Sequence, residues 1–251
     1  MTLLKVNNLS IEFGGVRAID DLSFTINPGT IHSIIGPNGA GKTTLFNLIT
    51  GVYTPTSGTI LYDDEGVTGF KSYELAARGM SRTFQNLQIF FNMTAIENVM
   101  VGAHLHLNRG FLASFFGLPS IKAGDRHCRE TCLELLDFVG LKKYADTDTE
   151  SMPYGALKRL EIARALASKP KILLLDEPAA GLNPAESREI DEVIKKVAER
   201  GITVVLVEHD MKMVMEISDH ILVLDYGRKL TEGTALEVRN NPDVIAAYLG
   251  G

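Results

Sequence analysis

The chain has 251 residues, of which 45% are hydrophobic and 22% are charged, proportions that are ordinary for a globular protein. This length can bury one α/β core with an inserted subdomain. The net charge of −6 argues against nucleic acid as the main partner, because contact with a phosphate backbone usually needs a basic face.

The cysteines and the apolar segments indicate the compartment. Cys128 and Cys132 are too few for a disulfide framework or a cysteine zinc site, so we expect reduced packing thiols in a cytosolic protein. The N-terminus lacks the pattern of a signal peptide, and no run of about eighteen apolar residues occurs. We therefore expect any membrane-spanning part to belong to another subunit.

The first 80 residues are expected to form strands joined by turns. Apolar and polar positions alternate over residues 3–26, and turn residues follow at 27–29 and 54–58. The expected strands are residues 4–6, 22–26, 31–35 and 59–62. Residues 73–79 are expected to form a helix.

A phosphate-binding pattern follows the strand expected at 31–35. Residues 36–44 match G-x-x-x-x-G-K-[ST] and lead into a helical stretch at 44–50, so N–H groups and a helix N-terminus can face one anion. Lys42 would reach the β- and γ-phosphates of a nucleotide, and the Thr43 hydroxyl would bind magnesium. The expected nucleotide contacts are Asn38, Gly39, Ala40, Gly41, Lys42, Thr43 and Thr44. The alternative, a glycine-rich turn that binds nothing, is disfavoured by the flanking strand and helix.

A helical region follows. Helical periodicity is clearest over residues 128–139 and 157–167, which predicts an inserted helical subdomain. An apolar stretch in this region suits either a partner surface or internal packing: Phe111, Leu112, Phe115, Phe116 and Leu118.

The α/β pattern returns after Pro170. Residues 172–175 and 203–207 are apolar throughout, as in central parallel strands, and a helix is expected between them at 185–200. A strand at 220–224 is expected to close the sheet. The chain is then a single domain over 1–251, with its core in 1–88 and 166–251 and the helical subdomain in about 89–165.

Two carboxylates directly follow the strand expected at 172–175. The C-terminal ends of parallel strands face the crevice where ligands bind, so Asp176 and Glu177 should face the phosphate loop. Asp176 would hold magnesium through water, and Glu177 would orient and deprotonate an attacking water. Solvated acids in a strand-end turn are the alternative, which the phosphate loop disfavours.

Two further polar residues have suggestive positions. His209 follows the strand at 203–207 and could contact a γ-phosphate, although a single histidine is as often structural. Gln85 lies where the sheet region meets the helical region, so it could report nucleotide state from one to the other.

Together these residues make the chain resemble the nucleotide-binding subunit of ATP-binding cassette (ABC) transporters over essentially its whole length. The matching features, in family order, are the phosphate loop, Gln85, residues 151–165, Asp176-Glu177, Gly181-Leu182-Asn183 and His209. The resemblance implies an α/β fold: a P-loop NTPase core with a mainly parallel central sheet, an N-terminal antiparallel β subdomain and the inserted helical subdomain.

The resemblance also implies roles for further residues. Family members bind ATP between two head-to-tail chains, so Tyr154 and Gly155 of the signature segment would contact the partner's nucleotide. Phe13 would stack on adenine, although a strand phenylalanine is otherwise most often core. Gln85 would join Thr43 and Asp176 around magnesium.

The signature segment departs from the family. The usual Leu-Ser-Gly-Gly-Gln is replaced by Met152-Pro153-Tyr154-Gly155-Ala156, which lacks the serine hydroxyl, and Pro153 has no N–H. A hydrogen bond to a charged group is worth about 1.5–3 kcal/mol, so sandwich affinity should fall roughly ten- to a hundredfold. The N–H groups of Gly155 and Ala156, at a helix N-terminus, are expected to restore part of it. We expect weak dimerisation without membrane subunits.

Within the family, the chain is most similar to the ATP-binding protein of branched-chain amino acid importers. The segments that carry this similarity are 82–85, 93–99, 176–184, 208–211 and 240–250. The similarity implies ATP hydrolysis that energises uptake of branched-chain or other hydrophobic amino acids. The implied partners are a second ATP-binding subunit, two transmembrane permease subunits and, indirectly, a solute-binding protein. The chain would lie at the inner face of the cell membrane.

Three alternatives stay open. The same ATPase could serve urea or amide uptake, or lipopolysaccharide export. A cassette ATPase of chromosome maintenance or DNA repair would need a long coiled coil or a basic surface, and neither is found in the sequence. A small-molecule kinase would share the phosphate loop but would not need the signature segment.

Overall fold

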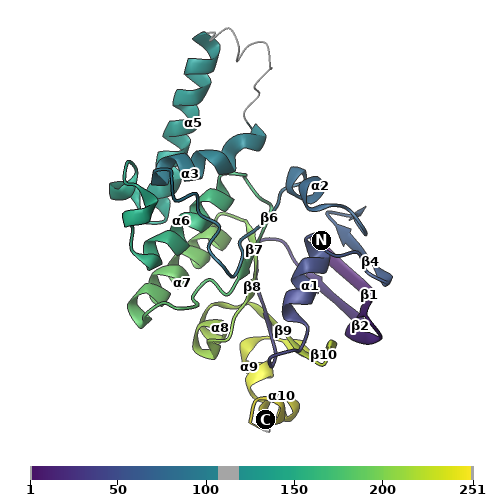
Figure 1. Cartoon of the computed structure of the whole chain (residues 1–251). Coiled ribbons are helices and arrows are strands. Elements are labelled where there is room, and N and C mark those ends of the chain that lie inside the picture. Colours follow the sequence, from purple (N-terminus) through teal and green to yellow (C-terminus); the bar gives the residue numbers. More distant parts are fainter. Residues whose placement is uncertain (1, 107–118, 250–251) are drawn as a thin grey trace.

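Two β-sheets form the framework of the molecule in the computed structural model, which describes residues 2–106 and 119–249 (Figure 1). The four-stranded sheet has the order β2-β1-β4-β5, and the six-stranded sheet has the order β10-β9-β3-β8-β7-β6. The strands of the smaller sheet are β1 (Leu4–Phe13), β2 (Val16–Ile26), β4 (Ser57–Tyr62) and β5 (Glu65–Gly66). Those of the larger sheet are β3 (Ile31–Ile35), β6 (Met80–Arg82), β7 (Ile172–Asp176), β8 (Thr203–Val207), β9 (His220–Asp225) and β10 (Arg228–Gly233).

The larger sheet is buried on both faces. Every residue of β3, β7 and β8 is buried, and these strands pair in parallel, as uninterrupted apolar runs predict. Alternate residues of β7 point to opposite faces: Leu173 and Leu175 pack among the helices, whereas Ile172 and Leu174 pack toward α1 and the smaller sheet.

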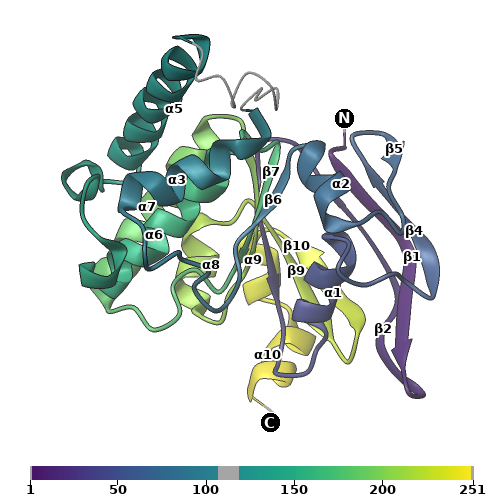
Figure 2. The ribbon, with the colours of Figure 1, turned by 45° about the horizontal axis from the view of Figure 1, so that its top comes forward.

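The helices cover the larger sheet on two sides. Figures 1 and 2 show α1 between the two sheets, and α6, α7 and α8 on the other side of the larger sheet. The α-helices are α1 (Lys42–Ile49), α2 (Ser72–Ala77), α3 (Ala95–Gly102), α5 (Pro119–Phe138), α6 (Tyr154–Leu166), α7 (Pro184–Glu199), α8 (Met211–Ile217), α9 (Ala235–Arg239) and α10 (Pro242–Leu249). The 3-10 turns are η1 (Ala103–His106), η2 (Lys142–Tyr144) and η3 (Thr149–Ser151).

Three helices, α3, α5 and α6, gather at one end of the molecule (Figure 2). Their buried apolar residues form one cluster that includes Val99, Cys132 and Leu160, and this cluster continues onto the sheet through Leu173. Cys128 and Cys132 are both free thiols buried in this packing, as expected. The boundaries of a helical subdomain remain a prediction. The interpretation of Phe111, Leu112, Phe115, Phe116 and Leu118 lies outside the described residues.

Two expectations about the sheet are wrong. The strand expected to close it, β9, is internal, because β10 pairs with it in antiparallel orientation and forms the edge. The expected elements also omitted β6, which forms the opposite edge beside β7. Both strands, MSR in β6 and RKLTEG in β10, are mostly polar, as edge strands often are, so they lack the apolar run by which central strands are predicted. Among the described residues, no helix has the length and apolar character needed to cross a bilayer.

Candidate nucleotide-binding site

The phosphate loop joins the end of β3 to the start of α1, and its glycines are required by the backbone. Gly41 has φ 100°, and a Cβ there would lie 2.7 Å from the carbonyl oxygen of Ala18. A Cβ on Gly36 would lie 2.2 Å from the carbonyl oxygen of Leu224. Helix α1 starts at Lys42, directly after Gly41, so its unpaired N–H groups face the loop.

A cavity of about 230 Å³ lies in front of this loop. Residues from β2, the loop, α1 and the ends of β7 and β8 line it: Ala18, Asn38, Gly39, Gly41, Lys42, Thr43, Thr44, Glu177 and His209. Six of the seven contacts expected from the phosphate loop therefore face one cavity together with Glu177 and His209, whereas Asp176 does not line it. Ala18 was not expected to line a nucleotide cavity, because no motif in the sequence around it indicates a ligand contact.

Ala40 does not line this cavity. Its side chain is buried, and its N–H donates to the carbonyl oxygen of Pro37 at 3.1 Å within the loop. A nucleotide contact by Ala40 therefore remains a prediction without support from its placement.

Lys42 is buried at the centre of the loop. Its Nζ donates to the carbonyl oxygens of Gly36 at 2.7 Å and Pro37 at 3.0 Å. Burial lowers the pKa of Lys42, while the charges of Glu177 and Asp176 act in the opposite direction. The ammonium is thus a poorly solvated cation held by carbonyl oxygens, which favours its interaction with an entering anion.

Glu177 lies at the centre of a three-residue contact. Its Oε1 lies 2.7 Å from Nε2 of His209, and its Oε2 accepts a hydrogen bond from Nε2 of Gln85 at 3.0 Å. The backbone of Glu177 is in the left-handed region, with φ 50°. Such a conformation costs about 1–3 kcal/mol in a residue other than glycine, so the surrounding structure must hold it in place.

Asp176 makes a buried ion pair with Arg82. Its Oδ2 lies 2.9 Å from Nη2 of Arg82, whose Nη1 also donates to Oδ1 of Asn47 at 2.7 Å and to Oγ1 of Thr50 at 3.0 Å. Arg82 was noted in the sequence only as part of a family match. Its position directly before Thr83-Phe84-Gln85 does not indicate this role, which depends on the pairing of β6 with β7.

These residues fit a magnesium ion that is held mainly by nucleotide and water. The hydroxyl of Thr43 lines the cavity, and no hydrogen bond among the described residues uses Oδ1 of Asp176. Gln85 can offer its amide oxygen, because its nitrogen donates to Glu177. Hydroxyl, carboxylate and amide oxygens suit Mg²⁺, which keeps several waters. The described residues contain no group of three His, Cys, Asp or Glu that could hold a metal.

Besides Ala40, four expected nucleotide contacts lie outside the cavity wall: Phe13, Gln85, Tyr154 and Gly155. Phe13, at the end of β1, is 46% exposed and packs edge-to-face on Tyr53 with ring centroids 5.2 Å apart. Tyr154 and Gly155 lie at the start of α6, where Tyr154 is also 46% exposed. Exposure leaves both aromatic rings available to a ligand or a second chain.

One expectation about the signature segment is wrong. Pro153 is the N-cap of α6 rather than its first helical residue, and the Ala156 N–H donates to the Pro153 carbonyl oxygen at 3.0 Å. Ala156 therefore cannot offer a free N–H to a phosphate. The N–H groups of Tyr154 and Gly155 have no acceptor among the described residues, as is usual in the first helical turn.

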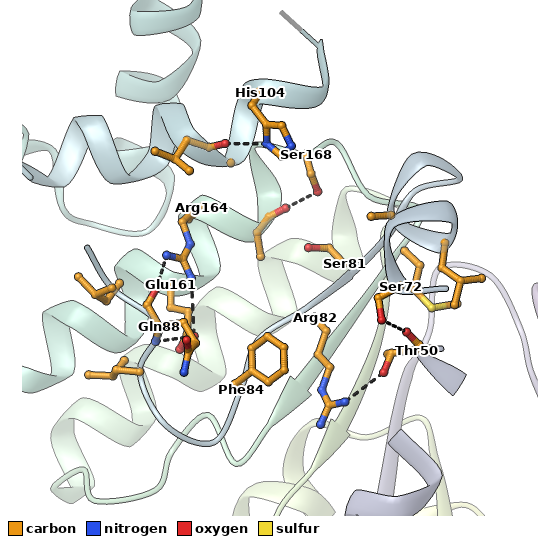
Figure 3. Close-up of a pocket in the computed structure, with 18 of the residues that line it drawn as sticks. Thr50, Ser72, Ser81, Arg82, Phe84, Gln88, His104, Glu161, Arg164 and Ser168 are labelled. Atoms are coloured by element: carbon orange, nitrogen blue, oxygen red, sulfur yellow. Dashed lines mark hydrogen bonds and ion pairs between the residues drawn. The ribbon is translucent and has the colours of Figure 1, made fainter. Parts of the chain in front are cut away.

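A second hollow, of about 520 Å³, lies between β6 and the helical end of the molecule (Figure 3). Phe84 and Phe90 are exposed on its wall. Glu161 of α6 is buried in its floor, where its Oε1 accepts the Gln88 N–H at 3.4 Å, and burial raises its pKa. Arg164 contacts the Gln88 carbonyl oxygen from the same helix.

A phosphate loop, two carboxylates at the end of another parallel strand of the same sheet and an inserted group of helices define an ATP-binding cassette. The comparisons agree: residues 19–180 match the family description "ABC transporter", and residues 228–251 match "Branched-chain amino acid ATP-binding cassette transporter".

Individual relatives cover the whole chain. The high-affinity branched-chain amino acid transport ATP-binding protein BraF of Pseudomonas aeruginosa is 46% identical over 249 residues, which are 99% of this chain and 98% of BraF. The ADP conformation of an ATP-binding cassette from an ABC transporter has a TM-score of 0.86 and 31% identity, covering 100% of both chains. A dimeric bacterial ABC transporter cassette has a TM-score of 0.78 and 27% identity, covering 93% of this chain and 99% of the other.

This chain belongs to the ABC transporter family, among the branched-chain amino acid transport ATP-binding proteins. It is an ATPase that serves a transporter. The predicted fold class is confirmed, including the mainly parallel sheet and the antiparallel β subdomain.

Proposed function

We propose that this chain hydrolyses ATP to energise the uptake of branched-chain or other hydrophobic amino acids through separate membrane subunits. The contact of Glu177 with both His209 and Gln85, at the edge of the phosphate-loop cavity, is the observation that best supports hydrolysis. The kinship to BraF supports the choice of substrate, because no residue of this site would touch the amino acid.

In the proposed reaction, the backbone N–H groups of the loop and the Lys42 ammonium bind the β- and γ-phosphates. Magnesium, held by Thr43, Asp176 and Gln85, would neutralise charge on the phosphates. Glu177 accepts the proton of the attacking water, and His209 contacts the γ-phosphate. His209 and Gln85 each contact one oxygen of the Glu177 carboxylate and so hold it in place.

The dimeric relative supports a head-to-tail pair in which Tyr154 and Gly155 face the nucleotide of the other chain. We propose that the second hollow receives a helix of a permease subunit. Its exposed Phe84 and Phe90 offer apolar contacts. It also lies between β6 and α6, so a movement of the helices would be transmitted to a helix bound there. The chain would then lie at the inner face of the cell membrane.

The test is to reconstitute the chain with its native permease subunits and to add solute-binding protein loaded with one solute at a time. We expect leucine, isoleucine or valine to raise the rate of ATP hydrolysis severalfold. A chain with Lys42→Ala should show no stimulation with any solute, because it cannot bind the phosphates. Stimulation by urea or short amides instead, or export of lipopolysaccharide, would overturn the substrate assignment.

A further inference from the structure

Lys158 is a buried lysine that the proposed reaction does not use. It lies in the second turn of α6 and is only 2% exposed. Its Nζ donates to the carbonyl oxygen of Gln85 at 3.3 Å and to the carbonyl oxygen of Glu177 at 3.4 Å. Because burying an ammonium is costly unless it is paired, these contacts need an explanation.

The contacts of Lys158 complete a ring of three hydrogen bonds. The Lys158 ammonium binds the main chains of Gln85 and Glu177, and the Gln85 side chain binds the Glu177 side chain at 3.0 Å. The three residues come from α6, the loop after β6 and the end of β7. The ring thus fastens a helix of the signature segment to the carboxylate beside the phosphate loop.

The surroundings of Lys158 suit a fixed cation. The face of the Tyr154 ring lies 5.9 Å from its Nζ, at the edge of the range for a cation–π contact. Glu161 lies three residues further along α6; burial raises the pKa of Glu161, and the charge of Lys158 acts to lower it. Lys158 does not line the nucleotide cavity, so it has no direct path to the phosphates.

We propose that Lys158 is a positioning residue for hydrolysis. It holds the main chain of Glu177 in its left-handed conformation and fixes the position of Glu177 relative to Gln85 and to α6. The proposal rests on Glu177 being the general base. Movement of α6 would pull on Glu177 and Gln85 together through one ammonium group. Loss of Lys158 should therefore impair the catalytic step and leave nucleotide binding intact.

The first test replaces Lys158 by Met in the full chain, which keeps the length of the side chain and removes the donor. We expect kcat for ATP hydrolysis to fall roughly tenfold or more, since two contacts of a charged donor are lost. The KM for ATP and the affinity for ADP should stay within about twofold. Lys196→Met, at an exposed position of α7, is the matched control and should change neither.

The second test is a double-mutant cycle with Gln85→Ala. If Lys158 and Gln85 act through the same placement of Glu177, the double variant should lose little more kcat than the more damaging single variant. Fold losses that multiply would show independent roles and overturn the proposal. An unchanged kcat in folded Lys158→Met would overturn it as well.

Two further variants keep the result decisive. If Lys158→Met does not fold, as judged by circular dichroism and ADP binding, Lys158→Gln takes its place, because it keeps a polar side chain that is one bond shorter and cannot bridge the carbonyl oxygens of both Gln85 and Glu177. A normal kcat in that variant contradicts the proposal, and a reduced kcat at unchanged KM supports it. Glu177→Gln separates the two hypotheses. If Glu177→Gln stops turnover while Lys158→Met does not, the positioning role fails and the proposed function stands.

Discussion

At the scale of single residues, the strand-end glutamate has the most demanding place in the chain. Glu177 adopts φ 50°, and each of its carboxylate oxygens contacts a different side chain. A strained backbone at a residue with fully used polar atoms is common at functional sites. The preceding residue, Asp176, instead forms a buried ion pair with Arg82 through one of its carboxylate oxygens. The two acids are adjacent in sequence but have different environments.

This difference predicts the outcome of Glu177→Gln. Glutamine keeps the size of the side chain and can still contact His209, but it cannot accept the proton of the attacking water. We expect kcat to fall by about a hundredfold or more, with ATP affinity nearly unchanged. Phosphate release and calorimetric ATP binding would measure the two quantities. Continued turnover at the original rate would show that another group is the base.

At the scale of elements, the pairing of β3 with β9 stacks a histidine of the strand before the phosphate loop on a histidine of the adjacent strand. His32 and His220 are opposite each other in the parallel pair, with ring centroids 5.4 Å apart. His32 is 7% exposed, and its Nε2 has no hydrogen-bond partner within the described structure. Burial, aided by the charge of His220, lowers the pKa of His32 to about 4, against opposing effects of Asp219 and Glu232.

This shift predicts acid sensitivity of the fold. An unfolded histidine titrates near pH 6.5, so between about pH 6.5 and pH 4 the unfolded state binds more protons and the free energy of unfolding falls as the pH falls. The full loss is about 3 kcal/mol. The variant His32→Phe keeps an aromatic ring but cannot be protonated. Its urea midpoint of unfolding should therefore depend less on pH between about pH 6.5 and pH 4. His127→Gln, at an exposed position of α5, should not. An unaltered slope in His32→Phe would contradict the assignment.

At the scale of the whole molecule, we expect the start of α6 to determine how tightly two chains associate. Pro153 caps the helix, and the N–H of Ala156 donates to the carbonyl oxygen of Pro153. Fewer hydrogen-bond donors are therefore left for a partner's nucleotide than the family pattern provides. The free N–H groups of Tyr154 and Gly155 remain, and the exposed Tyr154 ring lies close to Gly181. We therefore expect the chain to bind a partner's nucleotide less tightly than a typical cassette does.

We therefore predict that the isolated chain with ATP is mainly monomeric in light scattering at micromolar concentrations. Restoring the family serine with Pro153→Ser should tighten the dimer by roughly ten- to a hundredfold, because it returns a hydroxyl donor to a charged acceptor. Replacing the remote, exposed Glu192 by Gln is the control and should have no such effect. A stable ATP dimer of the unmodified chain would count against this account.

Much of the fold could be predicted because local patterns dominate its central elements. The strand at residues 203–207 was expected with the bounds that β8 has, and β3, α1 and α7 differ by at most two residues from their expected bounds. The phosphate loop could be located because its glycines are required by its own backbone. The edge strands β6 and β10 could not be predicted, because they are strands through their pairing with a neighbouring strand more than through their own composition. The roles of the site residues stay predictions.

By itself, the sequence determined the loop that turns its N–H groups inward, the buried strands that carry it and the acids at a strand end, because these depend on residues close together along the chain. Only the tertiary structure decided which polar atoms meet. Gln85 and Glu177 are 92 positions apart, Arg82 and Asp176 are 94 apart, and Lys158 reaches across 73 residues to Gln85. Such contacts follow from the order of strands and the docking of α6, which no local spacing specifies.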